Sequence, residues 1–345
     1  MATQREEDGI PFSIAHDFQQ FRLLELPPEI VELLDAPTPP RLSIKSQAPS
    51  SSDAPSASNT KPPYAVFCTP NKTFQIRQVG TSNSLFVTQQ TAEAHGNDAL
   101  FPTTRAIASC TTTLELHATE GSPTDYLDVL PVYDLVDGEL EARPNEKTKE
   151  DIFAHIPFSD GQCEKAWLDM VAFEYSGSSY RPSAKILAQV WTSINSAALA
   201  EGVKLDQQFI TEDLARAVAE EGHPVDLSAA ICKQLSNDDQ DKKGQWSCLD
   251  RARTVRFVGK NILQAKQATT SYTTTDFLDA WKDSLPEIWR AEAQLGAIEG
   301  LYHHPTPTTI IAKGSSPTTT DTPKLTAKAA SARKWHEKFG KTRKK

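Results

Sequence analysis

Apolar and polar residues nearly alternate over residues 72–79, which is the pattern of a strand with one buried face. Residues 80–84 are a cluster of Gly, Thr, Ser and Asn, and such a cluster is typical of a turn. Apolar residues resume over 85–87. The pattern therefore predicts a β-hairpin over 72–87. Its apolar positions are Phe74, Ile76, Val79, Leu85, Phe86 and Val87.

Other short segments in the first 150 residues also have the composition of strands. A short helix is expected at 29–34, and residues 36–63 are so rich in Pro, Ser, Ala and Thr that we expect a disordered loop. Five or six short strands predict an antiparallel sheet or barrel. The number is small for a closed barrel, and an incomplete one leaves an edge that a partner can cover. The further strands are expected at 21–26, 64–68, 105–110 and 113–117.

Helical periodicity replaces this pattern near residue 150. Ile186, Val190, Trp191 and Ile194 lie on one helical face. Three helices followed by a β-hairpin form a winged helix, and the sequence pattern predicts this arrangement twice. The expected helices lie at 163–170, 182–194, 211–222, 224–235, 251–266, 273–281 and 286–294, and the strands at 171–175, 244–247, 301–304 and 308–311.

These patterns divide the chain of 345 residues into four parts and predict the α+β class. An N-terminal antiparallel β domain spans 1–150. A first winged-helix domain spans 151–249, and a second spans 250–313. A linker and basic tail occupy 314–345.

Charge is distributed unevenly between the body and the tail. The whole chain carries −9, but residues 310–345 hold ten Lys or Arg residues against two acids, so the tail carries +8 and the remainder −17. A local basic cluster suits contact with nucleic acid or nuclear import, although a solvated tail has the same composition. The five cysteines are scattered, which favours reduced thiols in a nuclear or cytosolic protein. No apolar run is long enough to span a bilayer, and the N-terminus does not resemble a secretory signal.

Catalytic and metal-binding patterns are missing from the sequence. It has no nucleophile elbow, phosphate loop or dinucleotide-binding glycine motif. His303 and His304 are adjacent, but side chains of adjacent residues on a strand point to opposite faces, so the pair is a poor chelate. We therefore expect no enzymatic activity, no metal and no cofactor.

Two segments are candidates for DNA contact. Arg253, Arg256 and Lys260 share one face of the predicted helix at 251–266, while apolar residues occupy the opposite face. Guanidinium groups suit phosphate contacts, although the same face could be solvated and paired with nearby acids. In the tail, basic residues are interspersed with Trp335 and Phe339. The tail candidates are Arg333, Lys334, Lys338 and Lys341.

With these segments identified, the chain resembles the "defective in sister chromatid cohesion" subunit family of the alternative replication factor C clamp loader. The resemblance covers residues 20–312. The most specific stretch is Lys72-Thr-Phe through Thr81-Ser-Asn-Ser-Leu-Phe86, and the others are 21–26, 165–175 and 275–301.

The resemblance implies a non-catalytic nuclear scaffold and targeting subunit. Its β domain would form part of a composite β-barrel with a small companion subunit and the end of the large clamp-loader subunit, and the predicted hairpin would supply the partner-binding residues. Its winged helices would contact DNA and DNA polymerase epsilon, and the complex would act on the PCNA sliding clamp. Members of this family can carry three winged helices. Here only Ser331–His336 resembles the start of a third.

Two other functions fit parts of the pattern. A free-standing winged-helix regulator would bind DNA without the β domain's partners, but its reading domain would usually be basic. An enzyme would need a site that none of the known motifs reveals. The clamp-loader subunit is the hypothesis that accounts for both the incomplete sheet and the helical repeat.

Overall fold

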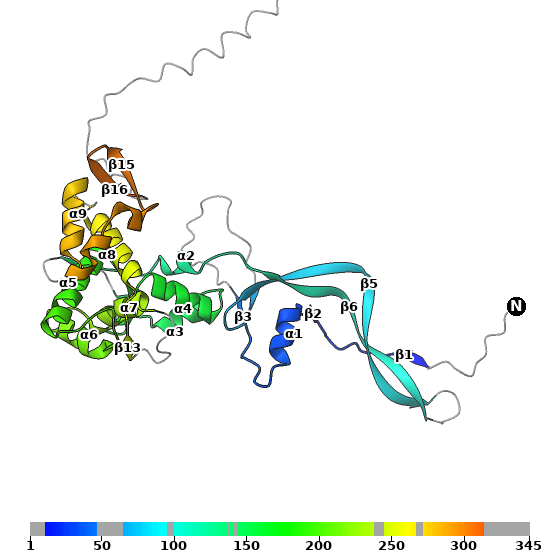
Figure 1. Cartoon of the computed structure of the whole chain (residues 1–345). Coiled ribbons are helices and arrows are strands. Elements are labelled where there is room, and N and C mark those ends of the chain that lie inside the picture. The colour runs from blue at the N-terminus through cyan, green and yellow to red at the C-terminus, as the bar shows by residue number, and fades with distance from the viewer. Residues whose placement is uncertain are drawn as a thin grey trace, which may run out of the picture.

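The computed structural model describes residues 11–46, 65–94, 100–136, 139–140, 144–237, 245–266 and 272–313. It has two parts, an extended N-terminal sheet and a helical body, joined near residue 120 (Figure 1). The chain therefore has the predicted mixed α and β composition. The predicted tail at 314–345 lies outside the described residues.

The N-terminal sheet is curled and open. Among the described residues the sheet has six strands. Five of them follow the order β1-β6-β5-β4-β3, and the sixth, β2, pairs with a second stretch of β6. Two long strands, β5 and β6, form a twisted ribbon that carries the whole sheet (Figure 1). The elements are β1 Phe12–Ile14, β2 Leu23–Glu25, α1 Pro28–Leu34, β3 Ser43–Ser46, β4 Ala65–Cys68, β5 Thr73–Ala94 and β6 Leu100–Ala118.

The predicted turn at 80–84 is wrong. These residues lie inside β5. Between the pairs Gly80–Thr112 and Leu85–Cys110, β5 advances by five residues while β6 advances by two, so the register shifts. Pairing with the long β6 keeps the strand continuous, and the surplus residues bulge out of the ladder instead of reversing the chain. Likewise, the two strands predicted at 105–110 and 113–117 are one strand.

The sheet is also not wholly antiparallel, and the loop prediction was too long. β1 and β2 both run parallel to β6, at Thr104–Ala106 and Thr113–Glu115. They lie end to end along one edge of β6, so both have the same direction. Within the predicted loop at 36–63, residues 43–46 form β3 against β4. The remainder from residue 47 lies outside the described residues.

A small core fixes one end of the ribbon. Helix α1 places Ile30 against Phe67, Phe74 and Leu116, and all four side chains are buried. Pro28 lies at the start of α1, where its missing N–H costs no hydrogen bond. Past this cluster the ribbon extends away from the helical body (Figure 1).

The helical body follows the short connecting helix α2 and consists of helices with short strands between them. Their bounds are α2 Thr124–Leu127, β7 Val132–Tyr133, β8 Leu135–Val136, β9 Glu139–Leu140, α3 Lys149–His155, α4 Asp160–Asp169, β10 Phe173–Tyr175, β11 Ser178–Pro182, α5 Ala184–Ala200, β12 Phe209–Ile210, α6 Thr211–Ala219, α7 Val225–Leu235, β13 Trp246–Ser247, α8 Arg251–Lys266, β14 Tyr272–Thr273, α9 Thr274–Asp283, β15 Tyr302–Thr306 and β16 Thr309–Ala312.

One continuous core runs through most of this body, from Tyr133 to Ala312. Helices α5 and α8 pack against each other at its centre. The buried Trp191 donates from Nε1 to Ser284 O at 2.8 Å, and the buried Trp281 donates to Val255 O at 3.0 Å. Because each indole N–H has an acceptor, both rings can be fully buried without losing a hydrogen bond.

The helix predicted at 286–294 is replaced by two 3₁₀ turns, η1 at Glu287–Glu292 and η2 at Leu295–Ile298. Trp289 and Ile298 are both buried on the core. Short 3₁₀ turns change direction more often than one α-helix does, so both side chains can point inward. The other predicted helices are present, with boundaries shifted by a few residues.

Candidate partner-binding ribbon and cationic helix face

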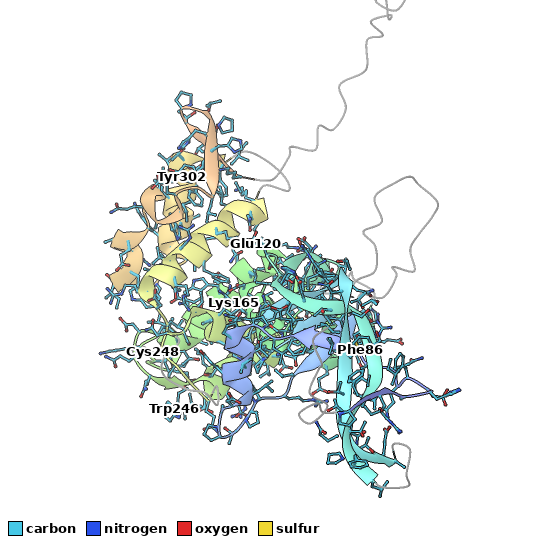
Figure 2. All side chains as sticks on the ribbon, turned by 90° about the vertical axis from the view of Figure 1, so that its right-hand side faces the viewer. Phe86, Glu120, Lys165, Trp246, Cys248 and Tyr302 are labelled. Atoms are coloured by element: carbon cyan, nitrogen blue, oxygen red, sulfur yellow. The ribbon has the colours of Figure 1, made fainter. Side chains whose placement is uncertain are left out.

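The ribbon of β5 and β6 exposes an unusual number of large apolar side chains. Leu85 and Phe86 are 49% and 50% exposed, and Leu100 on the facing strand is 70% exposed. Figure 2 shows Phe86 on the ribbon, apart from the helical body. Because neighbouring residues on a strand face opposite sides, these side chains lie on both faces of the ribbon, and exposed apolar side chains along both faces indicate a contact surface. Further exposed members are Phe12, Ile14, Phe18, Phe21, Val79 and Phe101.

The outer edge of β5 offers unpaired backbone groups beside these side chains. β4 pairs with β5 only as far as Gln75. Over the remaining length of β5, no strand among the described residues occupies that side. An open edge of this length is a template for a strand from another chain. The ribbon therefore combines the two features that β-augmentation uses, which are free ladder groups and apolar side chains.

The structure separates the six predicted partner-binding residues. Phe74 is 2% exposed inside the sheet's own core, so its side chain is not available to a partner. Ile76 and Val87 are half-buried. Val79, Leu85 and Phe86 are exposed and remain candidates.

Sequence reasoning missed the apolar residues on the facing strands, including Leu100 and Phe101. The signal was present as a Leu-Phe pair, but the adjacent Pro102 is a residue that strand interiors usually exclude. Phe12 and Ile14 alternate with a polar serine, but three residues are too short a stretch to identify a strand.

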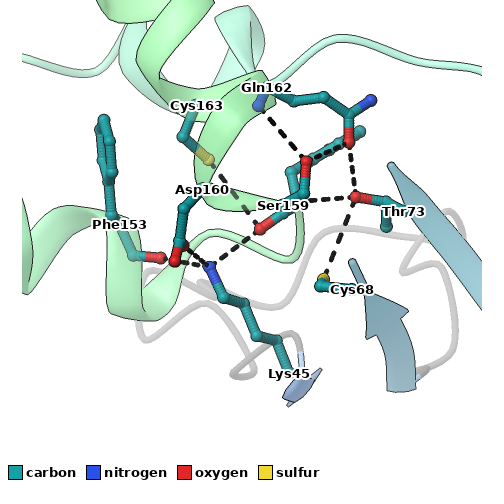
Figure 3. A network of polar contacts seen from close by, with 9 residues as sticks. Lys45, Cys68, Thr73, Phe153, Ser159, Asp160, Gln162 and Cys163 are labelled. Atoms are coloured by element: carbon teal, nitrogen blue, oxygen red, sulfur yellow. Dashed lines mark hydrogen bonds and ion pairs between the residues drawn. The ribbon is translucent and has the colours of Figure 1, made fainter. Parts of the chain in front are cut away.

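A polar network ties the sheet to the helical body (Figure 3). Lys45 Nζ on β3 donates to Phe158 O at 2.8 Å, to Phe153 O at 3.1 Å and to Asp160 Oδ1 at 2.8 Å. Beside it, Thr73 Oγ1 accepts from Ser159 N at 2.7 Å. The Lys45 side chain is 13% exposed, so its ammonium group is partly shielded from water and relies on these acceptors.

The same junction is closed by a glycine and a buried thiol. Gly161 N donates to Pro70 O at 2.9 Å, and a Cβ on Gly161 would lie 2.7 Å from that oxygen. Only glycine allows so close an approach. Burial raises the pKa of the Cys163 thiol to about 12, so this thiol stays protonated and unreactive while the junction is closed.

The predicted cationic face of α8 is largely committed inside the chain. Arg253 donates to Ser236 O at 2.8 Å and to Gln234 O at 3.2 Å, at the end of α7. Arg256 donates to Ala297 O at 3.0 Å. Lys260 is exposed, and no described residue pairs with its ammonium group. The four tail candidates lie outside the described residues.

The remaining candidate chemistry is sparse. His304 Nδ1 lies 2.9 Å from Thr309 O, next to the exposed His303. Within the described ranges, no three His, Cys, Asp or Glu side chains are grouped so that they could hold a metal ion. None of the helices in this part of the chain has the length and apolar composition needed to cross a membrane.

Comparison with known proteins identifies a family. A family model described as "Sister chromatid cohesion protein Dcc1" matches residues 21–316, which is most of the chain. No curated protein matches the chain. The matched span includes both the open ribbon and the helical body.

Proposed function

Because the chain belongs to the Dcc1 family of sister chromatid cohesion proteins, we propose that it is a non-catalytic scaffold and targeting subunit of an alternative replication factor C clamp loader. The observation that carries the proposal is the open edge of β5 beside an exposed apolar surface. A protein that worked alone would gain nothing from leaving such a surface in water.

A strand added to β5 would satisfy the unpaired backbone groups and cover Leu85 and Phe86. The proposed occupants are a small companion subunit and the C-terminal end of the large clamp-loader subunit. Together with the curled sheet they would close a composite barrel, which removes both the free edge and the exposed apolar side chains. This subunit would then act on PCNA only indirectly, with ATP hydrolysed by other subunits.

We propose that the helical body holds two winged helices. The order α5-β12-α6-α7-β13 fits one, with β12 paired to β13. The order α8-β14-α9-η1-η2-β15-β16 fits a second, whose three strands pair as β14-β16-β15. Their shared core supports one rigid unit that presents surfaces to DNA polymerase epsilon at a replication fork in the nucleus.

The ribbon proposal predicts the outcome of a tagged pull-down followed by mass spectrometry. The wild-type chain should recover clamp-loader subunits and a small companion. Changing Leu85→Asp and Phe86→Asp together should reduce that recovery roughly tenfold or more, because buried apolar anchors dominate interface energies. The melting temperature should not fall, since both side chains are exposed in the free chain.

Leu199→Asp is the control, because Leu199 is a leucine on α5 of the helical body that is 83% exposed, more than Leu85 or Phe86. It should leave recovery unchanged. Full recovery with the double variant would sink the ribbon proposal. Promoter occupancy by a wild-type chain that recovers no clamp-loader subunit would favour the alternative function, a free-standing winged-helix DNA-binding regulator.

A second prediction concerns DNA. We expect weak, sequence-independent binding carried mainly by residues 331–345, because Arg253 and Arg256 already donate to backbone carbonyls of the body. Deleting 331–345 should lower the affinity and flatten its salt dependence by about 0.9 per lost phosphate contact. Lys260→Gln alone should change the affinity little. Unchanged affinity and salt slope after the deletion, measured by fluorescence anisotropy, would rule out the tail as the DNA contact.

A further inference from the structure

A groove of about 500 Å³ lies along helix α6 and reaches the strand β12. The apolar residues that it leaves accessible are the half-buried Val203 and Ala217 and the exposed Ile210. Ile210 pairs with Trp246 of β13, and directly paired residues of antiparallel strands have their side chains on the same face. These two side chains are 42% and 46% exposed, so the apolar surface continues from the groove onto β13.

Acidic side chains border this groove. Glu201, Asp213 and Glu220 line it, are all exposed, and form its acidic border. Arg216 is the only base among the described residues of the lining, and it already pairs with Glu212 at 2.7 Å and with Asp213 at 3.6 Å. These four acids and one base give the groove a net charge of −3. An apolar floor with a negative border is complementary to a segment that carries apolar anchors among basic residues.

The chain's own segment 331–345 has this composition. It holds seven Lys or Arg residues against a single acid, Glu337. Trp335 and Phe339 lie four residues apart among these bases. One short segment therefore supplies two large apolar anchors together with a charge opposite in sign to that of the groove.

The chain between the body and this segment is long enough to reach the groove. The described chain ends at Lys313, after β16, and the 17 residues at 314–330 span up to about 56 Å when extended. In the body, β16 packs on α8, α8 on α5, and α5 on α6. Three such contacts of about 8–10 Å amount to roughly 30 Å, and a shift along the whole of α5 adds about 26 Å. Because these two displacements are roughly perpendicular, the groove lies within reach.

We propose that residues 331–345 dock into this groove. Trp335 and Phe339 cover Ile210 and the apolar floor, and the lysines around them pair with the acidic border. The body then neutralises its own basic segment, and DNA or another acidic partner has to compete with the groove for it. This contact uses no residue of the ribbon and does not depend on the clamp-loader assignment, so each proposal can fail without the other.

Carbodiimide cross-linking of the full-length chain tests this contact, because the reagent joins a carboxylate to a lysine amine only where the two groups touch. Peptide mapping by mass spectrometry should find the acidic border joined to lysines of 331–345 within one chain. Changing Trp335→Ser and Phe339→Ser together keeps every charge but removes both anchors. The cross-links should then fall roughly tenfold, because exposed ion pairs are weak by themselves and apolar anchors dominate such contacts.

Ile210→Ser should reduce the same cross-links, since Ile210 is the most exposed apolar residue of the groove. Ile288→Ser is the matched control that should leave them unchanged, because Ile288 is also an exposed isoleucine but lines a different cavity. Unchanged cross-links in the chain without its two anchors would overturn the proposal, as would cross-links spread equally over exposed acids elsewhere, such as Glu150. Cross-links that join two copies and none within a copy would also overturn it, since the segment would then occupy a neighbouring molecule.

Discussion

Replacing Gly259 by alanine should destabilise the helical body by about 2 kcal/mol, the difference between an overpacking cost of about 3 kcal/mol and a gain in helix propensity of about 1 kcal/mol. A Cβ on this residue would lie 2.5 Å from Cε2 and 2.6 Å from Cζ2 of Trp281. The indole cannot move away cheaply, because it is fully buried and donates to Val255 O at 3.0 Å. The gain in helix propensity on replacing glycine, about 1 kcal/mol, offsets only part of this cost.

Thermal unfolding followed by near-ultraviolet circular dichroism measures the effect. A loss of that size should lower the melting temperature by roughly 4–8 °C in a body of this length. Gly296→Ala is the control, since a Cβ there has no neighbour within 4 Å. If both variants melt together with the wild type, the close packing of α8 on Trp281 does not limit stability.

Lys45→Met should separate the sheet from the helical body while each part stays folded. The change keeps the apolar stem but removes the donor to two backbone carbonyls and the partner of Asp160. Each hydrogen bond to a charged group contributes about 1.5–3 kcal/mol, and the pair with the exposed Asp160 adds little, so the loss of the two carbonyl bonds should weaken the docking of the two parts by roughly 3 kcal/mol. Lys165→Met is the matched control, because Lys165 is an exposed lysine of α4 (Figure 2).

Alkylation of Cys163 reports whether the junction opens. In the wild type the buried thiol has a pKa near 12 and should resist iodoacetamide at about pH 8. In Lys45→Met it should be labelled faster, while Cys232, buried within the helical body, stays protected. Equal protection of Cys163 in both chains would mean that the remaining contacts, such as Thr73 with Ser159, hold the junction without the lysine.

Hydrophobic periodicity predicted the helices that bury one face along their own length. The apolar face of 186–194 and the face of Val255 and Val258 both form the core as expected. The turn at 80–84 failed because Gly, Ser and Asn tolerate a bulge as well as a reversal, and only the distant β6 decides between them. A window of ten residues contains no information about that partner.

The candidate sites divide in the same way, into residues that the local pattern identifies and residues whose role depends on distant contacts. Alternation identified Val79, Leu85 and Phe86 on the ribbon, but it could not tell that Phe74 on the same strand is covered by α1. Lys45 lay in a stretch whose composition suggested disorder, and its acceptors are more than 100 residues away. Its role follows from tertiary contacts alone, as does the internal use of Arg253 and Arg256.

The parallel pairing of β1 and β2 with β6 sets an order of events during synthesis. Residues 12–14 and 23–25 leave the ribosome about 90 residues before their partners on β6 do. At about 5–20 residues per second they wait roughly 5–20 s without a strand to join. Loop closure over that distance is costly, whereas the hairpin of β5 and β6 closes locally. The ribbon should therefore form first and capture its N-terminal strands last, so the nascent chain leaves the backbone groups of β1 and β2 and the side chain of Leu24 open to chaperones until the hairpin is complete.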